Sequence, residues 1–420
     1  MSEKKKLRVL VVPSDTSGCS FFRNTKPHVT LEEMYPDEFT VDIDYQPNLD
    51  DDNFLRQYDI IQYHRTLGNY ETMGQLTQKL EDMGIVSIMD IDDYWELSRS
   101  HPAFLLVKEH GLDKKILNNV KVAKNVTTTT TIFAKEIEKY NKNVYVVPNA
   151  IDPKEKQYIP NPEPSKRTRI GWCGGSSHLH DLQKLAGVAT KLKSDNLLDK
   201  VQLVLCGYDL RGTMTVIDQV TKQQTQRPIK PHESVWYEYE KIFTDNYKIV
   251  SPEYKEFLLS FKNEEYPNVD NEPYRRVWTK PVSTYATHYN YFDIALAPLE
   301  ENVFNRVKSS LKITEAAFHN KAIIAQNFGP YQIDTVNAIK FGGEIDPNGN
   351  CILIDANKDH KDWYKAIKRL ILEPELRENI KTNLYNDITP KYSMKHVTSQ
   401  RRDLYHKLVL DLKNKNQQKN

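Results

Sequence analysis

The side chains best suited to chemistry lie in one segment, FNRVKSSLKITE, that leads from a loop into a predicted helix. Arg306 and Lys308 stand where the first helical turn is expected, and Ser309 and Ser310 supply hydroxyls that can cap it. Cations at the start of a helix oppose its dipole unless an anion lies between them. The pattern predicts a pyrophosphate site, with Glu315 further along to bind ribose hydroxyls. The alternative is a solvated basic turn with a surface glutamate.

Carboxylates gather at a second place, where Asp90, Asp92 and Asp93 directly follow a predicted strand. Acidic groups this close repel one another, so we expect either a functional role or strong solvation. The functional interpretations are a general base, a binder of sugar hydroxyls, or a metal site of the DxD kind. The structural alternative is a capping cluster for the next helix.

Two glycine-containing turns also follow predicted strands. Gly174 and Gly175, followed by Ser176, let backbone N–H groups approach a phosphate, although a tight turn alone would explain them. Gly18 could bring the backbone close to a substrate, and Arg23 could bind a phosphate or carboxylate.

Histidines follow strand ends as well, with His64 before Arg65 and His101 before Pro102. A lone histidine is more often structural, but His101 is retained as a substrate-binding candidate. Serine, histidine and aspartate can be combined into triads on paper, yet the G-x-S-x-G elbow of a hydrolase is absent from the sequence.

The elements that must position these residues alternate between strands and helices. Short apolar runs predict buried strands at 7–13, 58–63, 85–89, 125–129, 144–147, 169–172, 201–205, 293–297, 322–325 and 351–354. Helical periodicity lies between many of them and again at 393–412. This order predicts an α/β fold of two Rossmann-like, doubly wound domains, in which ligands bind at the carboxyl ends of the strands and in the cleft between the halves.

The domain boundaries follow from composition. We predict an N-terminal domain over 1–158, a proline-rich linker over 159–169, and a second domain over 166–390. The aromatic stretch 209–291 is too long for a bare loop, so we expect an insertion with short helices of its own. The helix 391–412 should pack back on the first domain, followed by a disordered polar tail.

Composition excludes several classes of protein. The 420 residues carry 58 basic and 57 acidic side chains, a balance that gives no support to a nucleic-acid-coating protein. Four dispersed cysteines do not suggest a disulfide scaffold or a zinc site. Neither a signal peptide nor a membrane-spanning run is visible, so we expect a cytoplasmic protein, with contact at the inner face of the membrane left open.

The motifs GCSFFR, DIDDYWELSRSHP, VVPNAID, RIGWCGGSSHLHDL and YFDIALAPLEENVFNRVKSSLKITEAAFHNKAIIA, taken together, resemble bacterial glycosyltransferases of the GT-B fold. The resemblance is greatest to the retaining family 4, or group 1, type and covers most of the chain outside the insertion. It implies that the N-terminal domain is the acceptor side and that the second domain binds the nucleotide sugar. It also implies that Glu315 binds ribose, that Lys308, Ser309 and Ser310 face the diphosphate, and that the loop at Gly18 touches both donor and acceptor.

The chain departs from this family at two places. Val307 stands where the first of two spaced glutamates usually contacts the donor sugar, and His178 and His180 replace the usual Arg and Lys. Positive charge would then come from Arg306, Lys308 or Lys312.

The sequence therefore predicts a transferase that moves a sugar from a UDP- or GDP-type donor to the hydroxyl of a glycan, lipid-linked glycan or other acceptor. Lys308, Asp92 and Asp93 are the predicted catalytic residues, and no metal or other obligatory cofactor is expected. The alternatives are a nucleotide-sugar 2-epimerase, a GT-A enzyme with a metal-binding DxD, a non-catalytic binding protein, and a DNA-modifying glucosyltransferase, for which the even charge gives no support.

Overall fold

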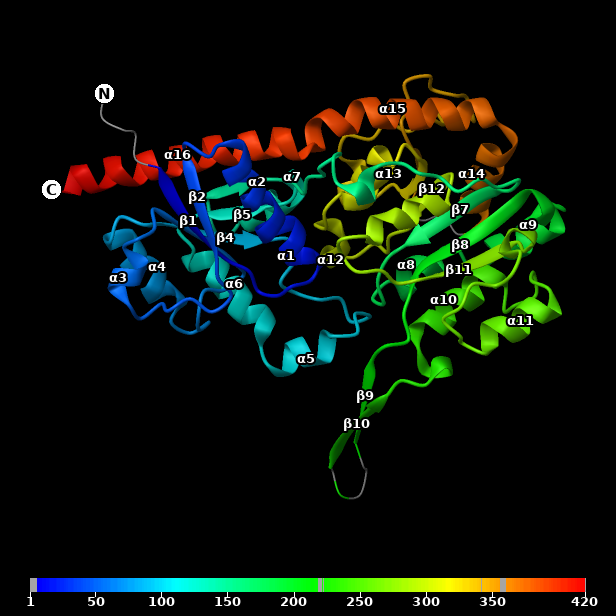
Figure 1. The fold of residues 1–420 in the computed structure, drawn as a ribbon, viewed down its shortest axis with the longest axis horizontal. Coiled ribbons are helices and arrows are strands. Elements are labelled where there is room, and N and C mark those ends of the chain that lie inside the picture. Colours follow the sequence, from blue (N-terminus) through cyan, green and yellow to red (C-terminus); the bar gives the residue numbers. More distant parts are fainter. Residues whose placement is uncertain (1–5, 218–220, 222, 341, 356–359, 420) are drawn as a thin grey trace. The chain divides into compact units, whose positions relative to one another are not determined.

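The computed structural model describes residues 6–217, 221, 223–340, 342–355 and 360–419. The chain forms two compact units. Unit 1 comprises Met1–Pro153, Glu301–Thr314 and Ile388–Asn420, and unit 2 comprises Lys154–Glu300 and Glu315–Asp387. Each unit is built on its own sheet (Figure 1).

Unit 1 contains a six-stranded, wholly parallel sheet in the order β2-β1-β3-β4-β5-β6. Its strands are β1 (Leu7–Val12), β2 (Phe39–Ile43), β3 (Ile60–His64), β4 (Val86–Ile91), β5 (Val126–Thr128) and β6 (Val144–Val146). Alternate residues face opposite cores: Leu10 packs on one side of the sheet, and Val9 packs with Tyr405 on the other. Burial on both faces explains why the strands read as continuous apolar runs.

Helices cover both faces of this sheet. Unit 1 holds α1 (Gly18–Ser20), the π-helix Phe21–Thr25, α2 (Lys26–Met34), α3 (Asp52–Leu55), α4 (Met73–Asp82), α5 (Phe104–Glu109), α6 (Leu112–Val122), α7 (Thr131–Ile137), α12 (Val303–Arg306) and α16 (Met394–Lys419). The start of α7 is fixed by Thr130, whose hydroxyl accepts a hydrogen bond from the Phe133 N–H at 3.1 Å. The region around β2 and α2 was not anticipated from the sequence, because β2 is only partly buried and lacks an apolar run.

Unit 2 contains a second parallel sheet in the order β11-β8-β7-β12-β13-β14. Its strands are β7 (Thr168–Cys173), β8 (Val201–Tyr208), β11 (Tyr274–Trp278), β12 (Ile294–Ala297), β13 (Ala322–Gln326) and β14 (Ile352–Ile354). Its helices include α8 (Leu179–Gln183), α9 (Val188–Ser194), α10 (Val235–Thr244), α11 (Pro252–Leu259) and α14 (His360–Leu372), with 3-10 turns at Lys156–Tyr158, Leu198–Lys200, Pro231–Glu233, Val269–Asn271, Tyr285–Tyr291 and Gly329–Gln332. Two parallel sheets with flanking helices make two Rossmann-like domains, as predicted.

The stretch predicted as an insertion contributes to unit 2 in two ways. The short helices expected there are α10 and α11, and a separate antiparallel hairpin is formed by β9 (Thr213–Ile217) and β10 (Gln224–Pro228). The hairpin extends away from the sheet (Figure 1). By contrast, β11 pairs with β8 and is an integral edge strand, so 209–291 is only partly an addition to the sheet.

The C-terminal part of the chain is two long helices. Prediction found α16 but missed α15 (Pro374–Tyr392), and the tail expected to be disordered is helical as far as Lys419. Within unit 1, α16 packs on α2, where the Tyr405 hydroxyl lies 2.6 Å from His28 Nε2. In the part of the chain that the structure describes, no helix is long and apolar enough to cross a membrane.

Candidate active site

Ligands of doubly wound sheets bind where neighbouring strands send their connections in opposite directions. In unit 1 this switch point lies between β1 and β3, because β1 is flanked by β2 and β3. Ser14 follows β1, His64 ends β3, and Asp92 follows β4, so these side chains meet at one edge of the sheet.

A chain of hydrogen bonds links these side chains. The Ser14 Oγ lies 2.7 Å from His64 Nδ1, and His64 Nε2 lies 2.9 Å from Asp92 Oδ1. His64 is 2% exposed and Asp92 9%, whereas Ser14 is exposed. The sequence placed His64 and Asp92 at strand ends, but nothing in it selected Ser14.

Asp92 and Asp93, both predicted as catalytic, have different electrostatic environments. Burial opposes ionisation of Asp92, but His64 and Arg65 hold its pKa well below the ordinary value. Burial and the charge of Asp92 raise the pKa of Asp93. Arg65 donates to Asp92 at 3.1 Å and approaches Asp93 at 3.5 Å. The two carboxylates therefore titrate in separate ranges, as an acid and a base would need.

Lys308 lies within unit 1, close to these carboxylates. Its ammonium opposes the rise in the pKa of Asp93 and adds to the effect of burial in lowering the pKa of His101, and it lies 5.0 Å from the centre of the Phe304 ring. His101 is half-buried, contacts the Phe304 ring edge-on at 5.5 Å, and accepts a hydrogen bond from the Ala103 N–H. Burial, together with Lys308, lowers the pKa of His101 and favours its neutral form. The structure therefore brings together Lys308, His101 and Asp93.

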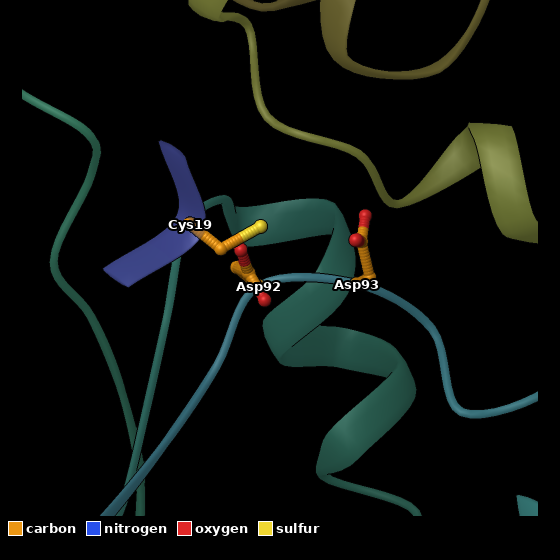
Figure 2. A group of neighbouring side chains, drawn as sticks. All are labelled: Cys19, Asp92 and Asp93. Atoms are coloured by element: carbon orange, nitrogen blue, oxygen red, sulfur yellow. The ribbon is translucent and has the colours of Figure 1, made fainter. Parts of the chain in front are cut away.

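Cys19 lies beside the same carboxylates, and Figure 2 shows its sulfur directed toward Asp92. Its sulfur and one oxygen from each of Asp92 and Asp93 lie within 4.8 Å of one another, a spacing that a metal ion could bridge. Burial and the two carboxylates raise the pKa of the Cys19 thiol, which disfavours a thiolate ligand. Arg65 already faces both carboxylates and Lys308 faces Asp93, so side chains compensate part of their charge.

Arg23, predicted to bind substrate, is completely buried. Its guanidinium pairs with both oxygens of Asp90 at 2.7 and 2.9 Å and donates to the Val147 carbonyl and to Asn149 Oδ1. Asp90 also accepts from Thr127 at 2.7 Å. Arg23 therefore contacts protein groups and supports the floor of the site. Gly18, by contrast, has open space where a Cβ would stand, so its surroundings leave room for a ligand.

In unit 2 the switch point lies between β7 and β12. Gly174 follows β7, and a Cβ there would lie 2.4 Å from the Trp172 ring, so this glycine is required by packing. A Cβ on Gly175 would meet nothing within 4 Å, and Gly175 and Ser176 are both exposed. The backbone at 175–176 is therefore the part of this turn that is open to an anion.

The two loops at this switch point are tied together by Asp181. One of its oxygens lies 2.7 Å from His178 Nδ1, and the other accepts from the Glu300 N–H at 2.6 Å. His178, which replaces a cation of the resembled family, is thus held by a carboxylate. His180 is exposed.

Glu315 lies in α13 (Leu311–Phe318) and is 4% exposed. The Tyr289 hydroxyl donates to its Oε2 at 3.0 Å, and the Tyr289 ring stacks on His319 with a centroid distance of 5.1 Å. Burial raises the pKa of Glu315 well above its ordinary value and lowers that of His319 to about 3. Among the described residues no group bonds to Glu315 Oε1, which is itself buried. A ribose could reach this carboxyl only after neighbouring groups move.

The predicted phosphate-binding segment differs locally from expectation. Arg306 was predicted in the first turn of a helix, but it is the last residue of α12, because Asn302 caps a separate short helix by accepting from the Asn305 N–H. Lys308 also precedes α13 instead of lying in its first turn, whereas Ser309 and Ser310 lie directly before the helix, where capping hydroxyls were predicted. Arg306 is exposed, Lys308, Ser309 and Lys312 are half-buried, and Ser310 is buried. Val307 is fully buried in the unit 1 core, which explains an apolar residue there.

Solved structures provide the comparison with known proteins. Sucrose-phosphate synthase from Thermosynechococcus elongatus matches 97% of this chain and 100% of its own, with a TM-score of 0.58 at 12% identity. A glycosyltransferase from Rickettsia africae has a TM-score of 0.57 at 12% identity, and the match covers 97% of this chain and 99% of that protein. The structure of Anabaena HepE in complex with UDP-glucose has a TM-score of 0.53 at 11% identity, and the match covers 96% of this chain and 99% of HepE. No family model and no curated protein matches the sequence. The chain thus has the GT-B fold of these glycosyltransferases.

Proposed function

We propose that this protein is a glycosyltransferase that moves a sugar from a nucleotide-diphosphate donor, of the UDP type, to an acceptor hydroxyl. The observation that carries the proposal is the placement of Lys308 beside Asp93 and His101, with Asp93 next to the Asp92–His64 pair at the carboxyl edge of the unit 1 sheet. A cation can stabilise a departing phosphate, and the carboxylate–histidine pair can handle the proton of a hydroxyl.

On the donor side, the exposed turn at Gly175 and Ser176 supports a role in phosphate binding through backbone N–H groups. Ser309 and Ser310 offer further hydroxyls before α13. The UDP assignment is supported by HepE, a GT-B neighbour whose structure holds UDP-glucose. Glu315 is proposed to meet the ribose after a local rearrangement, because its carboxyl is buried in this structure.

During transfer the bond between the sugar and the β-phosphate breaks, and negative charge develops on the phosphate. Lys308 would stabilise this charge, with Arg306 and Lys312 as outer cations. Asp93 would orient the acceptor hydroxyl. Retention of anomeric configuration and independence from metal ions are proposed from the family resemblance alone. The acceptor, a glycan, lipid-linked glycan or other hydroxyl, would be met in the cytoplasm or at the inner membrane face.

Two of the alternatives lose support. A GT-A enzyme would need Asp90 and Asp92 as a metal-binding DxD motif. Asp90 is buried and forms an ion pair with Arg23, and the fold is GT-B. The neighbours described above are transferases and a synthase, which favours transfer over 2-epimerisation. Measurement of turnover distinguishes the remaining alternative, a non-catalytic binding protein, from an enzyme.

The test is a thermal-shift screen with UDP, GDP, ADP, CMP and their sugars, followed by measurement of nucleoside diphosphate release from the sugar that stabilises most. We expect stabilisation by UDP and release of UDP from UDP-glucose or a related donor. Stabilisation without release would favour a binding protein, and no stabilisation by any nucleotide would contradict the proposal.

A further inference from the structure

A continuous chain of hydrogen bonds runs from the surface of unit 1 into its interior. Its outer end is the exposed Ser14 hydroxyl, 2.7 Å from His64 Nδ1, and its inner end is Asp92 Oδ1, 2.9 Å from His64 Nε2. Because His64 is 2% exposed, a molecule outside the protein reaches this imidazole through Ser14.

The histidine is held rigidly in this arrangement. Its neighbour Arg65 has a φ of 60°, a left-handed conformation that costs a non-glycine residue about 1–2 kcal/mol. The strained backbone is fixed on both sides, since the Arg65 N–H donates to the Asp90 carbonyl at 3.0 Å and the Arg65 carbonyl accepts from Asn119 at 3.1 Å. Strain of this kind persists where the surrounding structure over-determines it, and it concentrates at functional sites.

We infer that Ser14, His64 and Asp92 form a proton relay that removes the proton from the acceptor hydroxyl. This inference rests on the proposed transferase function and assigns roles within it. Ser14 is the catalytic residue that contacts the acceptor, His64 is the base behind it, and Asp92 is a positioning residue that holds the imidazole with its Nδ1 toward Ser14.

The step balances as follows. The acceptor hydroxyl gives its proton to Ser14 Oγ while Ser14 passes its own proton to His64 Nδ1, leaving an imidazolium paired with Asp92. The acceptor oxygen forms a bond to the anomeric carbon on the face from which the phosphate leaves, as the proposed retention requires. The bond from that carbon to the β-phosphate oxygen breaks, and the nucleoside diphosphate leaves with the electron pair.

A second carboxylate stabilises the outer end of the relay. Asp15 Oδ2 lies 2.9 Å from Ser14 Oγ, and hydrogen bonds from Ser14, Ser17 and Ser20 lower the pKa of Asp15 although burial opposes this. Asp15 therefore stays ionised, and once Ser14 has passed its own proton to His64 and taken that of the acceptor, its hydroxyl can donate a hydrogen bond to Asp15. Further charged or titratable groups that face the relay, among the residues that the structure describes, are Cys19, Arg23, Arg65, Asp93 and, beyond Asp93, Lys308.

The experiment measures UDP release from UDP-glucose between pH 5 and 9, with water as the acceptor, for the wild type and four variants. His64→Gln removes the base, Ser14→Ala breaks the relay, Ser14→Thr keeps a hydroxyl, and His110→Gln replaces an exposed histidine of the same unit as the matched control. UDP affinity is measured by calorimetry on each variant, so that loss of folding or of donor binding is seen directly.

We expect His64→Gln to lower the rate by about 10²-fold or more, the usual contribution of a positioned base. The pH dependence of the rate should change with it, because the variant lacks the base. Ser14→Ala should show a similar loss, Ser14→Thr should recover most of the rate, and UDP affinity should change less than about twofold, well under 1.4 kcal/mol.

A wild-type rate and pH profile in His64→Gln would assign the proton to the departing phosphate and overturn the relay. Equal losses in Ser14→Ala and Ser14→Thr, with UDP affinity intact, would show that the Ser14 hydroxyl carries no proton. If the wild type binds UDP but releases none from UDP-glucose, UDP-galactose or UDP-N-acetylglucosamine, the proposed transferase function fails first, and the relay falls with it.

Discussion

Replacing Arg23 with methionine should destabilise unit 1 strongly while leaving its exposed surface unchanged. The Arg23 and Asp90 side chains are 1% and 2% exposed, and they form two hydrogen bonds at 2.7 and 2.9 Å. Without the guanidinium, the buried carboxylate keeps Thr127 as its only side-chain donor among the described residues, and the Val147 carbonyl loses its bond of 2.7 Å.

The magnitude follows from this burial. Removing one partner of a buried ion pair costs about 3–5 kcal/mol, because the other charge is left uncompensated. The comparison variant is Arg65→Met, whose side chain is 30% exposed and whose Asp93 partner is 33% exposed, while its Asp92 partner is 11% exposed and keeps its hydrogen bond with His64. We expect that change to cost less than Arg23→Met, because solvent screens the Arg65 side chain in part and Asp92 is not left without a partner. The double variant Arg23→Met/Asp90→Asn should be more stable than Arg23→Met alone, because the stranded charge is gone.

Hydrogen exchange of the β4 amides is a suitable assay, since it reports the free energy of opening of unit 1 separately from unit 2. A loss below about 1 kcal/mol in Arg23→Met, together with a loss of substrate turnover, would refute this reasoning and restore Arg23 as a substrate-binding residue.

Three further changes test the donor side. Lys308→Ala should lower turnover by about 10²–10³-fold with little change in stability, measured as UDP release, and an unchanged rate would remove Lys308 from the mechanism. Gly174→Ala should destabilise unit 2 by about 1–3 kcal/mol through overpacking, whereas Gly175→Ala should leave stability unchanged and weaken UDP binding; equal stability of the two variants in urea unfolding would contradict the packing argument. Glu315→Gln should raise the melting temperature relative to the wild type by an amount that grows from pH 5 to pH 8. Burial raises the folded-state pKa of Glu315. The contribution of its protonated form to the stability of the wild type is therefore fully present below the unfolded pKa and is lost as pH rises toward the folded pKa. A constant difference between the melting temperatures across this range would show that Glu315 titrates normally.

Much of the fold could be predicted because its strands are buried on both faces. The runs at β1, β3, β4 and β8 are apolar throughout, which is the pattern of a parallel sheet. β2 and β11 were missed for the opposite reason. They are edge strands of mixed composition, and their pairing depends on neighbours distant in the sequence.

The candidate site was predicted unevenly. Strand ends pointed to Asp92, Asp93 and Lys308, and the structure brings these residues into one region of unit 1. Burial was the property that sequence could not supply. Arg23 and Glu315 looked like exposed ligand-binding groups, but tertiary packing encloses both. Ser14 was missed because an ordinary loop serine acquires its significance only from the position of His64.

Binding of UDP tests the central claim most directly. Thermal unfolding should be recorded with and without UDP, with GDP, ADP and CMP as matched nucleotides, and hydrogen exchange should then locate the effect. We expect UDP at a hundred times its dissociation constant to stabilise the protein by about 2.7 kcal/mol and to protect amides after β7 and before α13. Equal effects of all four nucleotides, or protection confined to other regions, would contradict a nucleotide-sugar transferase of the UDP type.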